Sequence, residues 1–125
     1  MKSIKILIAK HEVVVSLRET KTAKAVWNSC PFESKVKLWG KEIYFDTVIK
    51  VEKEKEAKQI VEKGEIAFWV EGQSIAVGFG PTPMSEADEI KLVTQANIFG
   101  DSLYDLTKLS DVGSGSLVRV EKISN

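Results

Sequence analysis

Apolar and polar residues alternate in short runs along most of the chain, a pattern typical of β-strands with one buried face. The clearest case is residues 64–83, where two apolar runs flank Gly72-Gln73. A two-residue turn there predicts three facing pairs: Val70 with Ile75, Phe68 with Val77, and Ile66 with Phe79. All six bulky residues then share one face. The opposite face becomes a shallow apolar floor that suits a flat, uncharged ligand. This floor is made of Ala67, Trp69, Ala76 and Gly78.

Strand patterns also occur on both sides of this hairpin. Six further strands are predicted, at 4–9, 12–17, 35–39, 42–46, 90–99 and 117–123. Within 42–46, Ile43 and Phe45 share the buried face because side chains alternate along a strand. Tyr44 is therefore expected to point away from the core.

Two short helices interrupt the strands. Thr20 or Thr22 can cap the first helix, which runs to about residue 29 because the residue before Pro31 is pushed out of the helical region. Residues 102–105 resemble a capping box and predict a second helix to about residue 109.

Residues 52–63 alternate glutamate and lysine and leave two interpretations open. One is a short helix supported by ion pairs three or four residues apart. The other is a charged connection in which Ile60 and Val61 turn inward.

The predicted elements favour a mainly β fold. Eight strands at close spacing, with two short helices, predict a closed eight-stranded antiparallel barrel. Closure removes exposed strand edges, and the alternation supplies an inward apolar face. Without an internal repeat or a linker, residues 1–125 are predicted to form a single domain.

Composition narrows the classes of partner. The 18 basic and 18 acidic residues balance, so no net field would attract nucleic acid or anionic lipid. No apolar run in the sequence is long enough to span a bilayer. We therefore expect a cytoplasmic protein with no nucleic-acid or membrane partner. The preference for lysine and glutamate over asparagine and glutamine is typical of heat-loving hosts.

The residue types needed for nucleophilic or metal chemistry are scarce. Cys30 is the only cysteine and His11 the only histidine, so a disulfide within the chain is impossible and a zinc site lacks ligands. No metal or cofactor is predicted, and nothing in the spacing brings Cys30 to His11. A further alternative is a hydrolase or lyase that uses Glu42 and Asp46 as paired carboxylates on one strand face, where like charges can raise a pKa.

Three motifs carry a resemblance to a known family. They are Gly-Glu-Ile-Ala-Phe-Trp at 64–69, Gly-Phe-Gly-Pro-Thr-Pro at 78–83 and Ala-Asn-Ile-Phe-Gly at 96–100. Over most of its length the chain resembles the small prokaryotic cyclophilin-like proteins of uncharacterised function. This resemblance implies the cyclophilin fold, an eight-stranded antiparallel barrel with helices covering its ends.

The resemblance also bears on activity. Cyclophilins isomerise X-Pro bonds in a groove on the outside of the barrel, where an arginine polarises the bond. The strand that most resembles the arginine-bearing one, at 40–45, contains no arginine, and Lys41 or Glu42 falls at the expected position. The resemblance therefore implies an outer groove without arginine-dependent isomerase chemistry.

We expect a binding protein that takes a peptide, a small molecule or a protein partner in this outer groove. The alternative is a peptidyl-prolyl isomerase in which Lys41 or the Tyr44 hydroxyl replaces the arginine. The candidate groove residues are aromatic, proline and polar side chains from the hairpin and the strands around it: Tyr44, Trp69, Phe79, Pro81, Thr82, Asn97 and Phe99. Each also has a structural interpretation; Trp69, for example, can simply cover Ala76 and Gly78.

Overall fold

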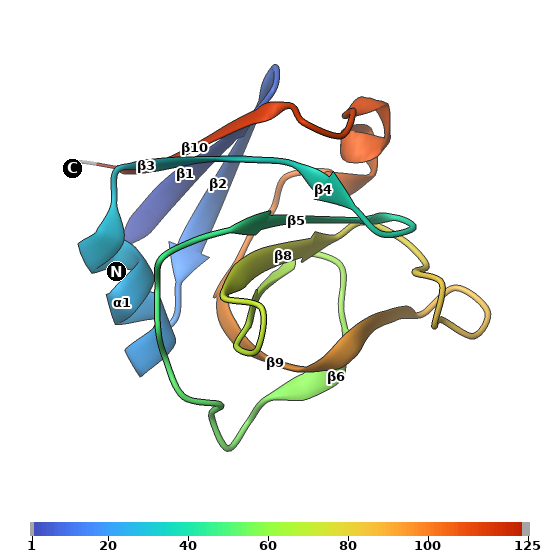
Figure 1. Ribbon diagram of the computed structural model, residues 1–125, viewed down its shortest axis with the longest axis horizontal. Coiled ribbons are helices and arrows are strands. Elements are labelled where there is room, and N and C mark those ends of the chain that lie inside the picture. The colour runs from blue at the N-terminus through green and yellow to red at the C-terminus, as the bar shows by residue number, and fades with distance from the viewer. Residues whose placement is uncertain (1, 124–125) are drawn as a thin grey trace.

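The structure, a computed structural model that describes residues 2–123, contains one curled antiparallel sheet (Figure 1). Its path runs in the order β3-β10-β1-β2-β9-β7-β8-β5-β4, and β6 pairs with β9 beside this path. The strands are β1 (Ser3–Ile8), β2 (His11–Leu17), β3 (Phe32–Lys35), β4 (Lys37–Leu38), β5 (Glu42–Asp46), β6 (Lys58–Val61), β7 (Glu65–Trp69), β8 (Ser74–Gly78), β9 (Ile90–Asp101) and β10 (Leu117–Lys122).

The barrel is nearly closed because both ends of the sheet belong to one continuous segment. β3 pairs with β10, and β4, which follows after Val36 alone, pairs with β5. Val36 is buried; its N–H donates to the Ser116 carbonyl (2.9 Å) and its carbonyl accepts from Gly115 N (2.8 Å). The sheet path therefore contains nine strands, one more than the sequence predicts. The additional strand arises because segment 32–38 forms two strands, β3 and β4, which are separated by Val36. The predicted antiparallel barrel is otherwise confirmed.

The main core fills the barrel. Every second residue of β1 is buried, as the alternation predicts. The largest fully buried side chains are Phe45 on β5, Phe68 on β7 and Phe99 on β9.

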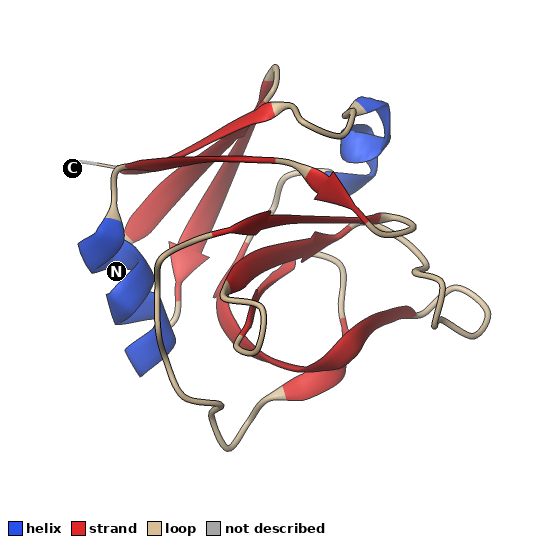
Figure 2. Ribbon diagram, in the orientation of Figure 1, coloured by secondary structure: helices blue, strands red, loops and turns tan. Residues whose placement is uncertain are grey.

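Two helices lie on opposite sides of the barrel (Figure 2). Helix α1 (Lys21–Ser29) is capped at its N-terminus by Thr20, whose Oγ1 accepts from Ala23 N over 3.0 Å, and it buries Val26 in the core. The second is a 3₁₀ helix, η1 (Leu106–Asp111), which buries Leu106 and Leu109.

The hairpin formed by β7 and β8 has the predicted faces in a different register. Phe68 pairs with Ile75, whereas a two-residue turn predicts Val77 as its partner. The loop contains four residues, 70–73, and the Trp69 ring lies against Gly72, where an added Cβ would be 2.3 Å from Trp69 Cε3. A shift of two residues returns each side chain to the same face, so the inward and outward sets are unchanged.

Two other predictions need correction. Residues 52–63 form the charged connection rather than a helix, with β6 at their end; Val61 turns inward, but Ile60 is exposed. The second helix begins later than predicted, because Asp105 caps η1. Ser102 instead donates to the Val14 carbonyl (2.7 Å).

Within residues 2–123, no helix has the length and apolar character needed to cross a membrane.

Candidate functional site

A second apolar cluster lies outside the barrel. Strand β9 is long and strongly curved (Figure 1). Its last residues pair with β7, while its first residues pair with β6 and cover the outer face of β7 and β8. Ile90 packs directly onto β8, since a Cβ added at Gly78 would lie 2.4 Å from Ile90 Cγ2. The buried members of this outer cluster are Val61, Ala67, Ala76, Ile90, Leu92, Ala96 and Ile98.

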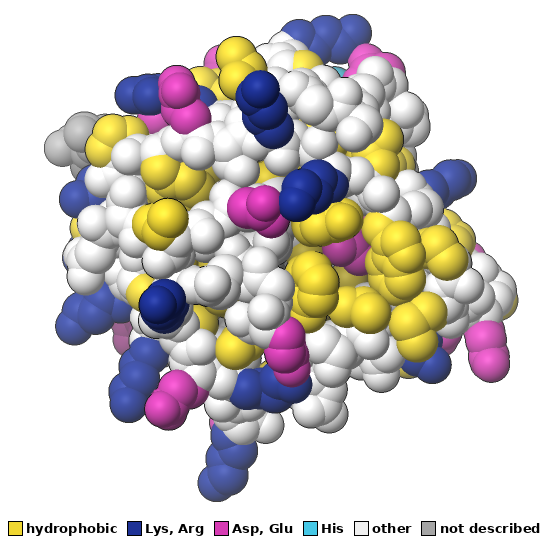
Figure 3. Space-filling view, viewed as in Figure 1, with side chains coloured by type: hydrophobic (Ala, Val, Ile, Leu, Met, Phe, Trp, Pro, Cys, Tyr) yellow, Lys and Arg dark blue, Asp and Glu magenta, His cyan; other side chains and the backbone are white. Residues whose placement is uncertain are grey.

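A half-open pocket of about 160 Å³ adjoins the outer cluster. On this side of the molecule, hydrophobic side chains gather around a hollow (Figure 3). The residues that line the pocket come from the turn before β5 and from β5, β7, β8 and β9: Trp39, Glu42, Tyr44, Trp69, Ala76, Leu92, Val93, Thr94 and Ala96. We call this site the aromatic pocket.

Aromatic rings make up much of the pocket wall. The centroids of the Tyr44 and Trp69 rings lie 6.0 Å apart, with the ring planes at 81°. Edge-to-face packing of this kind is favourable in its own right. The small side chains of Ala76 and Ala96 leave the space between the rings and β9 open.

Glu42 is the acidic residue of the pocket. Its side chain is only 6% exposed, and its Oε1 has no hydrogen-bond partner among residues 2–123. Burial disfavours the charged form and raises the pKa of Glu42 to about 7. Near neutral pH this carboxyl can therefore either donate or accept a hydrogen bond. The indole Nε1 of Trp69 is also buried without a partner in the described part of the chain.

The structure separates Glu42 from Asp46, which the sequence offers as a carboxylate pair. Asp46 is exposed, and its carboxylate accepts from Lys37 Nζ (2.9 Å) and Ser74 Oγ (3.1 Å). Hydrogen bonds from these two residues hold the pKa of Asp46 below its ordinary value. The raised pKa of Glu42 comes from burial, so the structure gives no support to the paired-carboxylate hypothesis.

Of the seven groove residues predicted from sequence, Tyr44 and Trp69 meet in the aromatic pocket and the others lie elsewhere. Phe79 and Phe99 belong to the barrel core, as does Phe68. They face inward because the curvature of the barrel turns their side of each strand toward the lumen.

The predicted polar and proline candidates have structural contacts instead. Asn97 is fully buried and its side chain bonds to Thr22. Thr82 is also buried, and its hydroxyl bonds to Ser85 and to the Lys91 carbonyl. The carbonyl of Pro81 accepts from Lys41 N (3.0 Å). The contacts of Thr82 and Pro81 stabilise the loop 79–89, and none of the three residues lines the pocket.

Sequence reasoning missed most of the pocket wall. Trp39 and the β9 residues 92–96 were not candidates, because nothing local indicates that β9 folds over the outer face of the hairpin. Glu42 carried a usable signal, since it shares a strand face with Tyr44. The sequence, however, does not show that Glu42 is buried while Asp46 on the same face is exposed.

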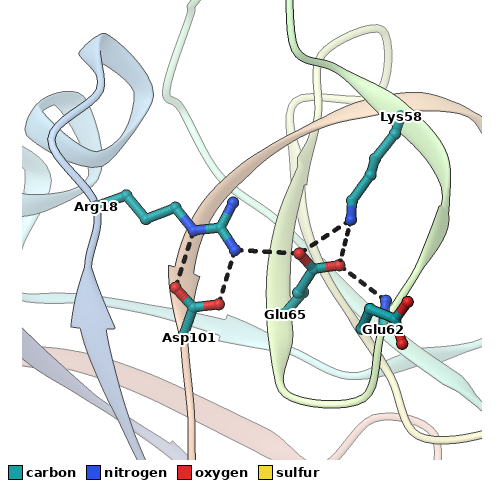
Figure 4. Close-up of polar contacts among 5 residues, drawn as sticks. All are labelled: Arg18, Lys58, Glu62, Glu65 and Asp101. Carbon is teal, nitrogen blue, oxygen red and sulfur yellow. Dashed lines mark hydrogen bonds and ion pairs between the residues drawn. The ribbon is translucent and has the colours of Figure 1, made fainter.

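Both arginines are held in ion pairs away from the pocket. Arg18 forms a bidentate pair with Asp101 (2.8 Å for each bond) and also reaches Glu65 (3.1 Å), which Lys58 contacts from the other side (Figure 4). Arg119 bonds to Glu121 and Glu33. Arg18 follows β2 and Arg119 lies on β10, and because β1 lies between these two strands the arginines are not on paired strands.

His11 and Cys30 form no catalytic pair. His11 is buried and bonds through Nδ1 to the Tyr104 hydroxyl (2.7 Å) and through Nε2 to Asp111 (2.7 Å). These hydrogen bonds connect the start of β2 to η1 and to the segment before it. Cys30 donates to the Val26 carbonyl (3.3 Å), and burial raises the pKa of its thiol, which makes it a weak nucleophile. No group of three or more metal-ligating side chains occurs in the described residues.

Comparison with known proteins places this geometry in a family. The hypothetical protein AF2241 from Archaeoglobus fulgidus has a similar solution structure, with 33% sequence identity and a TM-score of 0.83 over 98% of this chain and 95% of that one. McbB, solved in complex with tryptophan, is similar in fold, with 18% identity and a TM-score of 0.68 over 98% of this chain and 45% of that one.

No curated protein matches the chain at a significant level. The family described as cyclophilin-like matches residues 2–121. The chain belongs to the cyclophilin-like family.

Proposed function

We propose that this protein binds a small organic molecule in the aromatic pocket. One observation carries the proposal: Glu42 is buried in a mostly apolar pocket, and its Oε1 has no partner among residues 2–123. Leaving a buried polar group unsatisfied costs about 1–3 kcal/mol. A ligand that bonds to the carboxyl would remove this cost on binding. The unpartnered Nε1 of Trp69 in the same wall supports the same interpretation.

The dimensions of the pocket favour a small molecule over a peptide. Its volume of about 160 Å³ is close to that of an apolar cavity known to hold a benzene molecule. A peptide would need an extended groove with backbone partners, and a protein partner would need a larger apolar surface. Flat walls such as the Tyr44 and Trp69 rings suit a single planar or compact group.

The comparisons are compatible with this proposal. McbB, which shares the fold, has been solved with tryptophan, so a protein of this fold occurs with a small aromatic molecule. That likeness extends to the fold alone. The argument for this chain depends on its own pocket residues.

Nuclear magnetic resonance provides a direct test with indole as the probe. The three tryptophans give three indole N–H signals, and only Trp39 and Trp69 line the pocket. We expect millimolar indole to shift the Trp39 and Trp69 signals and to leave that of Trp27 in place. Trp27 therefore serves as an internal control.

Substitutions distinguish the pocket from other surfaces. Trp69→Leu removes one wall and should weaken indole binding about two- to tenfold, which corresponds to the loss of one aromatic contact. Trp27→Leu is the matched control and should bind as the wild type does. Shifts spread evenly over all three tryptophans, or none at millimolar indole, would rule out a small-molecule site in this pocket.

A further inference from the structure

We infer that the natural ligand of the aromatic pocket is an organic cation, a substituted ammonium group held between the aromatic walls and the Glu42 carboxylate. This inference rests on the proposed binding function and names the class of ligand.

The first argument is charge compensation. A carboxylate taken out of water needs a counter-charge, or it neutralises by taking up a proton. None of the described residues that line the pocket is basic. Lys37, on the neighbouring strand, lies over the Tyr44 ring at 5.9 Å from its centroid and is paired with Asp46 (2.9 Å). The Lys41 side chain lies against the Gly80 backbone, where an added Cβ would be 2.7 Å from Lys41 Cδ. The protein thus leaves the charge of Glu42 for the ligand to balance.

The second argument comes from the rings. The face of a tyrosine or tryptophan ring carries negative potential and attracts cations, tryptophan most strongly. Tyr44 and Trp69 stand at 81° to one another and form a corner, and Trp39 contributes a third ring to the same pocket. Aromatic walls around a carboxylate provide the chemistry that recognises substituted ammonium ions.

The third argument concerns the donor in the wall. The indole Nε1 of Trp69 is an N–H group without a partner among residues 2–123. It can donate only, so it calls for an acceptor on the ligand. A compact ammonium compound with a nearby hydroxyl or carbonyl oxygen satisfies both Glu42 and Trp69. The pocket volume of about 160 Å³ limits the ligand to a group of roughly that size.

Binding of a cation should depend on the protonation of Glu42. With a pKa of about 7, the carboxylate form rises from about a tenth at pH 6 to about nine-tenths at pH 8. Tyr44 is the other titratable residue of the pocket wall. On the adjoining strands, Lys37 and Asp46 are paired with each other, and Lys91 lies on β9. Affinity for a cation should therefore increase about tenfold from pH 6 to pH 8.

Choline and its uncharged carbon analogue, 3,3-dimethylbutan-1-ol, form a matched pair for the test. They have nearly the same shape and the same hydroxyl, and they differ in charge. Affinities can be measured from the indole signals of Trp39 and Trp69. We expect choline to bind about tenfold more tightly than the alcohol at pH 8, because its positive charge is attracted both by the aromatic ring faces and by the Glu42 carboxylate. At pH 6 the two compounds should differ much less.

Two variants assign the effect to one carboxyl. Glu42→Gln keeps the shape and should reduce the preference for choline severalfold and abolish its pH dependence. Glu71→Gln is the control, because Glu71 is exposed and paired with Lys53; it should behave as the wild type does. Should Glu42→Gln fail to fold, the pH dependence of the wild type tests the same point.

The outcomes separate this inference from the proposed function. Equal affinity for choline and the alcohol at pH 8 would overturn the inference that the ligand is a cation. The pocket would remain a binding site if indole binds. A preference for choline that is the same at pH 6 and pH 8, and unchanged in Glu42→Gln, would also overturn the role of Glu42. If choline, the alcohol and indole all leave the Trp39 and Trp69 signals unchanged, the proposed function fails as well.

Discussion

Asn97 on β9 donates a hydrogen bond from Nδ2 to Oγ1 of Thr22 on α1, over 3.0 Å, and both side chains are fully buried. The same Nδ2 donates to the Glu52 carbonyl (2.9 Å), and the Asn97 Oδ1 accepts from Glu54 N (2.8 Å). One amide thus ties the curved strand to the helix and to the charged connection. Asn97 is part of a sequence motif that suggested a groove residue, but its contacts are those of a structural residue.

We predict that Asn97→Ala lowers the free energy of unfolding by about 2–4 kcal/mol, because it leaves several buried polar groups without partners. Urea denaturation monitored by circular dichroism measures this change. Gln95→Ala is the matched control, since Gln95 is an exposed amide on the same strand. It should alter stability by no more than about 0.5 kcal/mol. Equal effects of the two substitutions would show that the Asn97 contacts contribute little.

Glu42 should make the stability of the protein depend on pH. Its folded-state pKa is raised from 4.5 to about 7, so between these values the folded state binds more protons than the unfolded state. The resulting contribution is fully present below about pH 4.5 and is lost as the pH rises through 7. Its size is about 3 kcal/mol, from a shift of two to three pKa units.

Glu42→Gln should remove this loss. We expect urea denaturation to show a smaller fall in stability from pH 5 to pH 8 in Glu42→Gln than in the wild type. Identical pH profiles for the two proteins would mean that Glu42 has an ordinary pKa and is better solvated than its 6% exposure indicates.

The two arginines should differ in their importance for stability. Arg18 joins Asp101 to Glu65, whose side chain is only 12% exposed, whereas the partners of Arg119 are more exposed. We predict that Arg18→Met costs about 1–2 kcal/mol near pH 7. Arg119→Met is the matched control and should cost less than about 1 kcal/mol.

The cost of Arg18→Met should shrink in acid. Although burial opposes ionisation, hydrogen bonds from Lys58, the Glu62 backbone and Arg18 lower the pKa of Glu65. The Arg18 hydrogen bond is the main cause that lowers the pKa of Asp101. Stability from lowered carboxyl pKa values is present above their ordinary values of 4.5 and 3.8 and is lost as the pH falls further. A cost that stays constant down to pH 3 would contradict this account.

We predict no prolyl isomerase activity at micromolar protein in a protease-coupled assay. Both arginines are held in ion pairs away from the pocket, and a Glu42 carboxylate would repel electron density at a proline nitrogen. The alternative in which the Tyr44 hydroxyl polarises the bond makes the opposite prediction. It would be supported by acceleration in the wild type that Tyr44→Phe abolishes and Lys41→Ala preserves.

Much of the barrel could be predicted from the sequence, because the direction of a strand side chain depends only on its immediate neighbours. The alternation around Phe68 and Ile75 assigns both to the core in either register, since the two registers differ by a full period of two. The same reasoning places Tyr44 and Trp69 outside the barrel.

Only the tertiary structure decided what covers that outer face. The aromatic pocket exists because the first half of β9, about fifty residues after Glu42 in the chain, curves over β8 and encloses the carboxyl. The pattern of residues 42–46 predicts a strand with one solvated face. No local pattern predicts that a distant segment of the chain covers this face. Contacts of long sequence separation bury Glu42 and raise its pKa, and they leave Asp46 on the same strand face solvated. The sequence by itself therefore determined which side of each strand is apolar, while long-range packing determined which polar group on the other side became available for a ligand.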